Sequence, residues 1–329
     1  MPEKAKMTEK IMKALKKLVL VGALAIAASG VASAETRVTF KSAKTTSSYY
    51  QMAVQISEAM KNGSKGDVIV TVEESQGSVQ NVLGAVARTG NYVFTTPPVL
   101  VSLAQGGKAM FEDKADPKFD DIRALFPIPS LTMHFVVRAD SGISNFADLE
   151  GKTILIGKGS FGAKEGAKYL KLFGLEGKVN LADVELSNAV PALKNGQIDG
   201  FVTAGSYPAP NIIEAAAGTG VKVLSLSDEQ VTLTKRTRLV IPAGTYAGQG
   251  NDVVTTSLPV VAYSTTNMDD DTAYKLTKTY WDQKAAMGKG AAWWNGVSFD
   301  MLKNITGRIH PGAVKYYLEN GVSLADHQK

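Results

Sequence analysis

Two glycine-serine turns are the residues of this sequence best suited to holding a ligand. Gly77 with Ser78, and Gly159 with Ser160, each lie between a predicted strand and a segment of helical period. Open α/β sheets bind ligands in loops at the carboxyl ends of their strands, and glycine lets the backbone approach closely. The serine can donate to a ligand oxygen, and the N–H groups of a helix start favour an anion. Each serine could instead cap its own helix, so both interpretations stay open.

Catalytic and metal chemistry find little support. The chain contains no cysteine, and none of its three histidines, His134, His310 and His327, has a nucleophile or a metal-ligating partner nearby in sequence. Three aspartates at 269–271 suit the start of a helix, with a metal site as the alternative. No G-x-S-x-G or H-E-x-x-H motif occurs. We therefore predict no enzyme, no catalytic residues, no cofactor and no metal.

The amino terminus predicts a secretory signal peptide. Residues 1–17 contain six lysines, an apolar run follows at 18–28, and small residues continue to Ala34. The run is shorter than the roughly 20 residues that span a bilayer, which disfavours the alternative of a membrane anchor. We expect cleavage near Ala34, which makes 1–34 a signal peptide, and a mature chain in the periplasm.

Removal of this leader would also change the charge. The full chain has 36 basic and 31 acidic side chains, and 30 and 29 of them lie after residue 34. A nearly neutral chain without a basic run is not expected to bind nucleic acid.

The remaining chain alternates short β-branched runs with segments of helical period, which predicts an α/β fold. Strands are expected in "RVTFKS" (37–42), "DVIVTVEE" (67–74), "YVFTT" (92–96), "LTMHFVVR" (131–138), "TILIG" (153–157), "ADVEL" (182–186), "IDGFVTA" (198–204), "VKVLSL" (221–226), "LVIPAGTY" (239–246) and "DVVTTSLPVVAYS" (252–264). Two stretches, 76–94 and 186–202, both run from a loop through a helix and a glycine into a strand. This internal similarity indicates two related lobes.

Six segments of the chain together carry a family resemblance: the leader, "GSVQN" (77–81), "DLEGKTILIGKGSFG" (148–162), "LKNGQIDGF" (193–201), "IPAGTY" (241–246) and "HPGAVKYYLENG" (310–321). They resemble the TAXI family of solute receptors, which serve TRAP transporters. The resemblance covers the chain after residue 34 and implies a two-lobed type II periplasmic-binding-protein fold with a central cleft and crossing hinge strands. We expect lobe 1 at 35–137 and 243–329, and lobe 2 at 138–242.

This resemblance implies a monomeric receptor that closes its lobes on a small anionic solute, such as a dicarboxylate, glutamate or 2-oxoglutarate, and delivers it to membrane TRAP subunits. An ABC-importer receptor for sulfonate-like or aromatic solutes is the alternative within the fold, and an enzyme on the same scaffold is the alternative outside this class. The loops "KTTSSYY" (44–50) and "TTPP" (95–98), with Asn91, differ from the family pattern, so the solute stays open.

The expected ligand-binding residues lie in loops and at strand ends facing the cleft. They are Ser47, Ser48, Tyr50, Gly77, Ser78, Asn81, Thr95, Thr96, Ser160, Phe161, Gly162, Thr203, Ser206 and Tyr207. Tyr49 shares a helical stripe with apolar residues, which leaves Tyr50 as the expected cleft wall. Arg138 is the best placed arginine for a carboxylate clamp, with a surface salt bridge as the alternative. Asp199, in "LKNGQIDGFVTAG" (193–205), is expected to accept backbone N–H groups rather than to contact the solute.

Overall fold

The computed structural model describes residues 35–329, and the predicted signal peptide lies outside them. Ten strands form one sheet in the order β2-β1-β3-β10-β4-β7-β5-β6, with β8 paired to β4 and β9 to β10. Their bounds are β1 Thr36–Lys41, β2 Val68–Glu73, β3 Tyr92–Thr96, β4 Ile122–Arg138, β5 Thr153–Leu155, β6 Asn180–Ala182, β7 Gly200–Gly205, β8 Val221–Val223, β9 Thr237–Ile241 and β10 Val253–Thr265.

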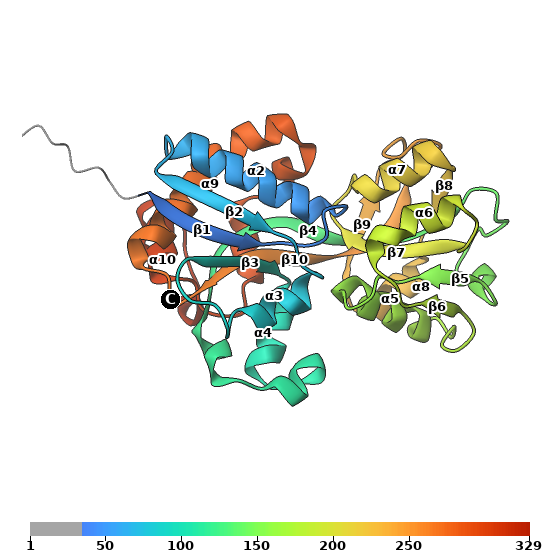
Figure 1. Cartoon of the computed structure of the whole chain (residues 1–329), viewed down its shortest axis with the longest axis horizontal. Coiled ribbons are helices and arrows are strands. Elements are labelled where there is room, and N and C mark those ends of the chain that lie inside the picture. The colour runs from blue at the N-terminus through green and yellow to red at the C-terminus, as the bar shows by residue number, and fades with distance from the viewer. Residues whose placement is uncertain (1–34) are drawn as a thin grey trace, which may run out of the picture. The chain divides into compact units, whose positions relative to one another are not determined.

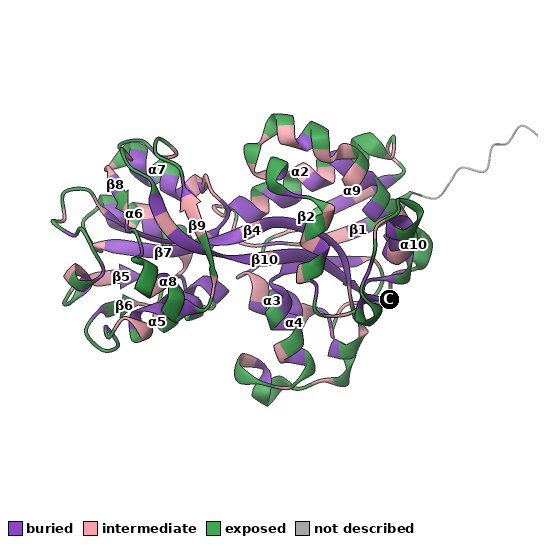
Figure 2. Ribbon diagram, turned by 180° about the vertical axis from the view of Figure 1, so that it is seen from behind, coloured by how far each residue is buried: buried purple, intermediate pink, exposed green. Residues whose placement is uncertain are grey.

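Two long strands connect the halves of this sheet. β4 and β10 pair antiparallel to each other from Thr132 and Ser257 to Ile122 and Thr265. In the first lobe β10 also pairs with β3, while in the second lobe β4 pairs with β7 and β10 with β9. Both strands are buried along most of their length, as the purple ribbons of Figure 2 show. The predicted crossing strands are therefore present, and β4 begins nine residues before the predicted start at Leu131.

Helices cover the sheet in both lobes (Figure 1). Their bounds are α2 Ser48–Gly63, α3 Ser78–Gly84, α4 Pro98–Gln105, α5 Phe161–Leu172, α6 Ala189–Lys194, α7 Pro210–Gly218, α8 Asp228–Thr234, α9 Asp270–Gly290 and α10 Pro311–Glu319. In the second lobe, α5 lies on one face of β7, and α6 and α7 lie on the other. Within residues 35–329, no helix combines the length and the apolar character needed to cross a membrane.

The packing of the second lobe corrects one predicted boundary. Tyr246 and Val253 are buried in the same apolar cluster as Leu193 and Ile212. The chain therefore returns to the first lobe within β10, later than the expected residue 243. The strand predicted at 182–186 is also displaced, because β6 ends at Ala182.

Asp199 has the structural role that its sequence suggested. α6 ends at Lys194, and Gly196 follows with a φ of 68°, a left-handed conformation that suits glycine. Asp199 Oδ2 then accepts from the backbone N–H of Thr153 at 2.8 Å, which fixes β5 beside the start of β7.

Asp199→Asn is expected to lower the free energy of unfolding by about 1 kcal/mol, because a charged acceptor is replaced by a neutral one. Solute affinity should stay unchanged, since Asp199 does not line the pocket described below. Chemical denaturation and a binding titration check both expectations. A variant that unfolds like the parent and fails to bind would place Asp199 in the site.

Candidate ligand-binding site

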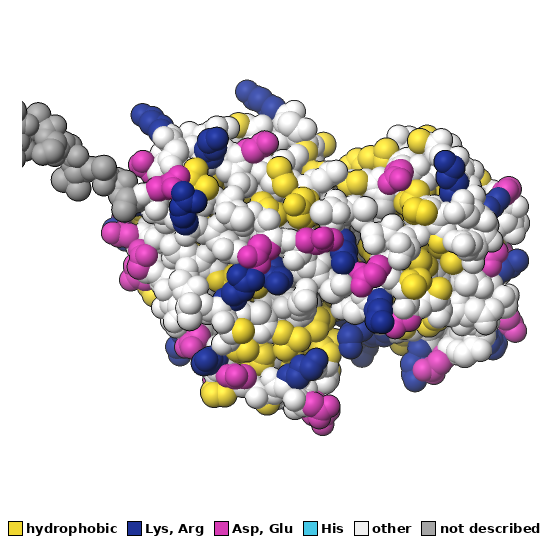
Figure 3. All heavy atoms as spheres, in the orientation of Figure 1, with side chains coloured by type: hydrophobic (Ala, Val, Ile, Leu, Met, Phe, Trp, Pro, Cys, Tyr) yellow, Lys and Arg dark blue, Asp and Glu magenta, His cyan; other side chains and the backbone are white. Residues whose placement is uncertain are grey.

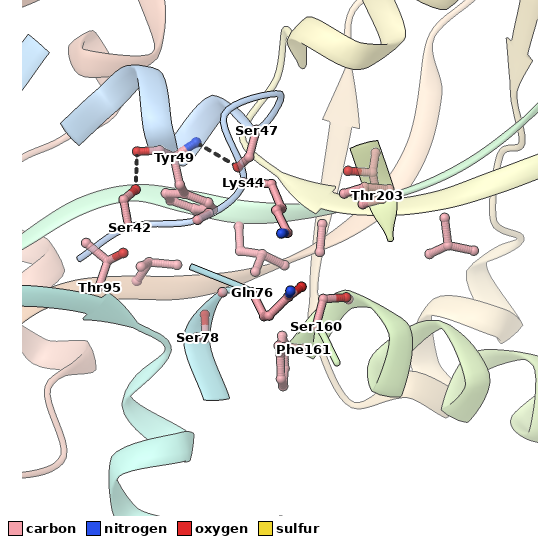
Figure 4. A pocket seen from close by; sticks show the side chains of 18 of the residues that line it. Ser42, Lys44, Ser47, Tyr49, Gln76, Ser78, Thr95, Ser160, Phe161 and Thr203 are labelled. Atoms are coloured by element: carbon pink, nitrogen blue, oxygen red, sulfur yellow. Dashed lines mark hydrogen bonds between the residues drawn. The ribbon is translucent and has the colours of Figure 1, made fainter. Parts of the chain in front are cut away.

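A pocket lies between the two lobes, against the strands that connect them. From the first lobe it is lined by the β1–α2 loop, the β2–α3 loop and the end of β3, and from the second by the β5–α5 loop, β7 and Leu186. Leu131 of β4 and Val260 of β10 lie at its base. Figure 4 shows the side chains from both lobes facing one shared space. The free volume is about 50 Å³.

Eight of the predicted residues line this pocket. They are Ser47, Gly77, Ser78, Thr95, Ser160, Phe161, Gly162 and Thr203. The hydroxyls of Ser78 and Thr95 make no hydrogen bond within residues 35–329, so both are available to a solute. Thr203 Oγ1 accepts from Asn211 Nδ2 at 3.2 Å, which leaves its hydroxyl proton for a ligand.

Ser160 caps its helix. Its Oγ accepts from the N–H of Ala163 at 2.9 Å and donates to the carbonyl of Gly157 at 2.8 Å. The capping interpretation therefore holds for this serine, and the backbone of Phe161 and Gly162 forms the pocket surface beside it. An added Cβ at Gly162 would lie 2.9 Å from the Cβ of Ala204, so glycine is needed for α5 to approach β7.

Gly77 and Ser78 begin a short helix. Gly77 has φ 106° and ψ −161°, a conformation open only to glycine. α3 is a short helix of seven residues. The side-chain donor that this turn offers to the pocket is the Ser78 hydroxyl.

Six predicted residues do not line this pocket: Ser48, Tyr50, Asn81, Thr96, Ser206 and Tyr207. Ser48 and Ser206 join the lobes instead, because Ser48 Oγ accepts from the N–H of Ser206 at 2.9 Å. Asn81 is fully buried, and its Nδ2 donates to the carbonyls of Ser42 and Thr95. Tyr207 lines a separate pocket of about 490 Å³ together with Ser206 and Trp293.

The prediction that Tyr50, and not Tyr49, forms the wall of the cleft was wrong. Tyr49 lines the pocket, and its hydroxyl donates to the carbonyl of Pro129 on β4 at 3.1 Å. Burial raises the pKa of Tyr49 above its ordinary value, so the phenol stays protonated. Tyr49 is both core and wall because α2 begins at the cleft, where its buried stripe reaches the pocket.

Sequence reasoning also missed the charged and amide groups of the pocket, Lys44, Gln76 and Lys158. Lys158 forms no ion pair within residues 35–329. Lys44 Nζ lies 3.1 Å from Glu185 Oε2 and 3.7 Å from Glu74 Oε1. The position of Lys158 directly before the glycine turn was the only local signal.

The arginine and the histidines have structural partners outside the pocket. Arg138 pairs with Asp140 at 2.8 Å, which confirms the surface salt bridge. His134 and His310 are buried, and His327 contacts the carbonyl of Ile305 at 3.2 Å. Across residues 35–329, no group of three or more potential metal ligands converges.

The lobes, the crossing strands and the pocket between them define the class of two-lobed solute-binding folds. Similarity to the periplasmic binding protein BugD supports this class, with a TM-score of 0.57 and 11% identity over 88% of this chain and 99% of that one. The chain belongs to the NMT1-like family, whose model matches residues 40–321.

Two further solved structures match with lower TM-scores. One is the alkanesulfonate-binding protein SsuA from Xanthomonas axonopodis pv. citri, with a TM-score of 0.46 and 15% identity over 88% of this chain and 80% of that one. The other is a TRAP periplasmic solute-binding protein of Actinobacillus succinogenes 130z with bound L-galactonate, with a TM-score of 0.43 and 14% identity over 88% and 87%.

Proposed function

We propose that this chain is a non-enzymatic, extracytoplasmic receptor that binds a small anionic solute between its lobes. One observation carries the anion: among residues 35–329, the only charged side chains that line the pocket are the lysines Lys44 and Lys158. The free hydroxyls of Ser78 and Thr95 add donors for carboxylate oxygens. An anion loses its hydration when it enters the pocket, which is strongly unfavourable without charged or hydrogen-bonding partners. The lysines and hydroxyls of this lining supply such partners, so the pocket favours a negatively charged solute.

The proposed mechanism is a population shift. An open form would admit the solute, and contacts from both lobes would favour the closed form. The closed form would then dock, as a periplasmic monomer, on an ion-coupled TRAP importer. The sequence segments similar to the TAXI family support this partner. Copurification with membrane subunits tests it, and recovery of an ATPase component would instead favour an ABC importer.

The solute is tested by native mass spectrometry of freshly purified protein, followed by thermal shift assays. We expect stabilisation by dicarboxylates or acidic amino acids, with glutamate and 2-oxoglutarate as the first compounds. A solute at 100 times its Kd adds about 2.7 kcal/mol to the stability of the folded state. Stabilisation by neutral apolar compounds alone would overturn the anion proposal, and turnover of a bound compound would overturn the non-enzymatic role.

Lys158→Met is expected to weaken binding of the most stabilising dicarboxylate by about tenfold or more, because a charged hydrogen bond contributes about 1.5–3 kcal/mol. Lys164→Met is the matched control, since Lys164 is an exposed lysine of α5 that does not line the pocket. Isothermal titration of both variants checks the difference. Equal affinities in the two variants would remove Lys158 from the site.

A further inference from the structure

One acidic side chain of the second lobe contacts two loops of the first. Glu185 lies between β6 and α6, directly before the pocket residue Leu186. Its Oε1 accepts from Gln76 Nε2 at 2.9 Å, and its Oε2 lies 3.1 Å from Lys44 Nζ. Figure 4 shows the Lys44 and Gln76 side chains extending toward the same space from different loops. Both contacts therefore cross from one lobe to the other.

Lys44 and Glu185 are both partly shielded from solvent. Their side chains are 21% and 35% exposed. The Lys44 ammonium, with smaller contributions from Gln76 and Lys158, holds the pKa of Glu185 below its usual range. The carboxylate is thus charged at neutral pH. Figure 3 shows acidic and basic side chains next to each other at the boundary between the two halves.

We propose that Glu185 is a positioning residue that holds the lobes closed over the pocket. Its two carboxylate oxygens join the β1–α2 loop and the β2–α3 loop to the second lobe. Separation of the lobes must break both contacts, whereas the Lys44–Glu74 contact lies within the first lobe and survives opening. The inference concerns the closing of the site proposed above and rests on that proposal.

A different role for the same carboxylate makes the opposite prediction. If Glu185 only reduced the positive potential at Lys44, its removal and the removal of Glu74 would have the same effect, and both would favour an anion. If Glu185 joins the lobes, only its removal favours the open form. Glu74→Gln is therefore the matched control, because it removes a carboxylate beside Lys44 without affecting a contact between lobes.

Lobe opening can be measured directly and without any solute. The chain has no cysteine, so cysteines at the exposed positions Lys61 on α2 and Lys164 on α5 can carry a pair of spin labels. Double electron-electron resonance then gives the distance distribution between the lobes. We expect Glu185→Ala to raise the ratio of open to closed molecules about fivefold, and Glu185→Gln to raise it less, because a glutamine can still accept from Gln76.

The parent and Glu74→Gln should share one distribution. Coincidence of the parent and Glu185→Ala distributions, whether narrow or broad, would overturn the proposal. An equal shift in Glu74→Gln and Glu185→Ala would also overturn it, in favour of the charge effect. Thermal melting of each variant confirms that it is folded. Because no solute is added, this result is separate from the solute screen, whose failure would contradict the receptor function alone.

Discussion

Arg236→Met is expected to lower the free energy of unfolding by about 3–5 kcal/mol, because it leaves a buried carboxylate without its main partner. Glu165 on α5 has a side chain that is only 5% exposed. Arg236 donates to it through Nε at 2.8 Å and through Nη2 at 3.2 Å, a bidentate pair. The remaining cation, Lys168, lies 3.8 Å away and is 45% exposed, so it is a weak replacement.

A second arginine supplies the control for this prediction. Arg238, two residues further along the chain, pairs with Asp228 at 3.2 Å, and both side chains are at least half exposed. Arg238→Met should therefore cost about 1 kcal/mol or less. The double variant Glu165→Leu with Arg236→Met should recover much of the loss, because no charge stays buried. Equal costs for the two single variants, measured by denaturant unfolding, would show that burial does not distinguish these pairs.

The lobe architecture could be predicted from the sequence because the strands have strong local patterns. "YVFTT" is buried at every position, and α2 buries Met52, Ala53 and Ile56 as its stripe predicted. The prediction of a strand at 182–186 was wrong because β6 is a three-residue edge strand, and Val184 beyond its end is 45% exposed. Apolar alternation indicates a strand only where one face is covered.

The pocket could be predicted in part. Glycine-serine turns and strand ends have a local sequence signature, which explains why Ser78, Thr95 and Ser160 were found. Lys44 and Gln76 have none, because their place depends on how two loops of one lobe meet the other. Asn81 does not line the pocket for a related reason: its Nδ2 donates to two carbonyls that come together only in the folded chain.

The partners of His134 could not be predicted either, because its position in an apolar strand does not show which distant groups it contacts. In the structure His134 is fully buried on β4 near the connection between lobes. Nδ1 lies 3.1 Å from the carbonyl of Thr132, which can only accept, so Nδ1 carries the proton. Nε2 then accepts from the Tyr246 hydroxyl at 3.2 Å, and that hydroxyl accepts from the N–H of Ala209. A neutral imidazole satisfies this chain of hydrogen bonds, and an imidazolium would not.

Acidification is therefore expected to destabilise the protein through His134. Burial lowers the pKa of His134 to about 4, whereas an unfolded histidine titrates near 6.5. Between these values the unfolded state binds a proton that the folded state does not, so stability falls as the pH falls. The full loss is on the order of 3 kcal/mol, and about 2 kcal/mol of it should appear between pH 7 and pH 5.

His134→Gln separates this effect from the other titrating groups. The variant is expected to be less stable at pH 7, because glutamine reproduces the hydrogen bonds imperfectly, but to lose about 2 kcal/mol less than the parent on going to pH 5. Burial also lowers the pKa of His310, and that contribution is common to both proteins. Denaturant unfolding at the two pH values gives the difference. Parallel pH profiles for parent and variant would mean that His134 takes up a proton in the folded state as readily as in the unfolded state, and the hydrogen-bond assignment at Tyr246 would then be wrong.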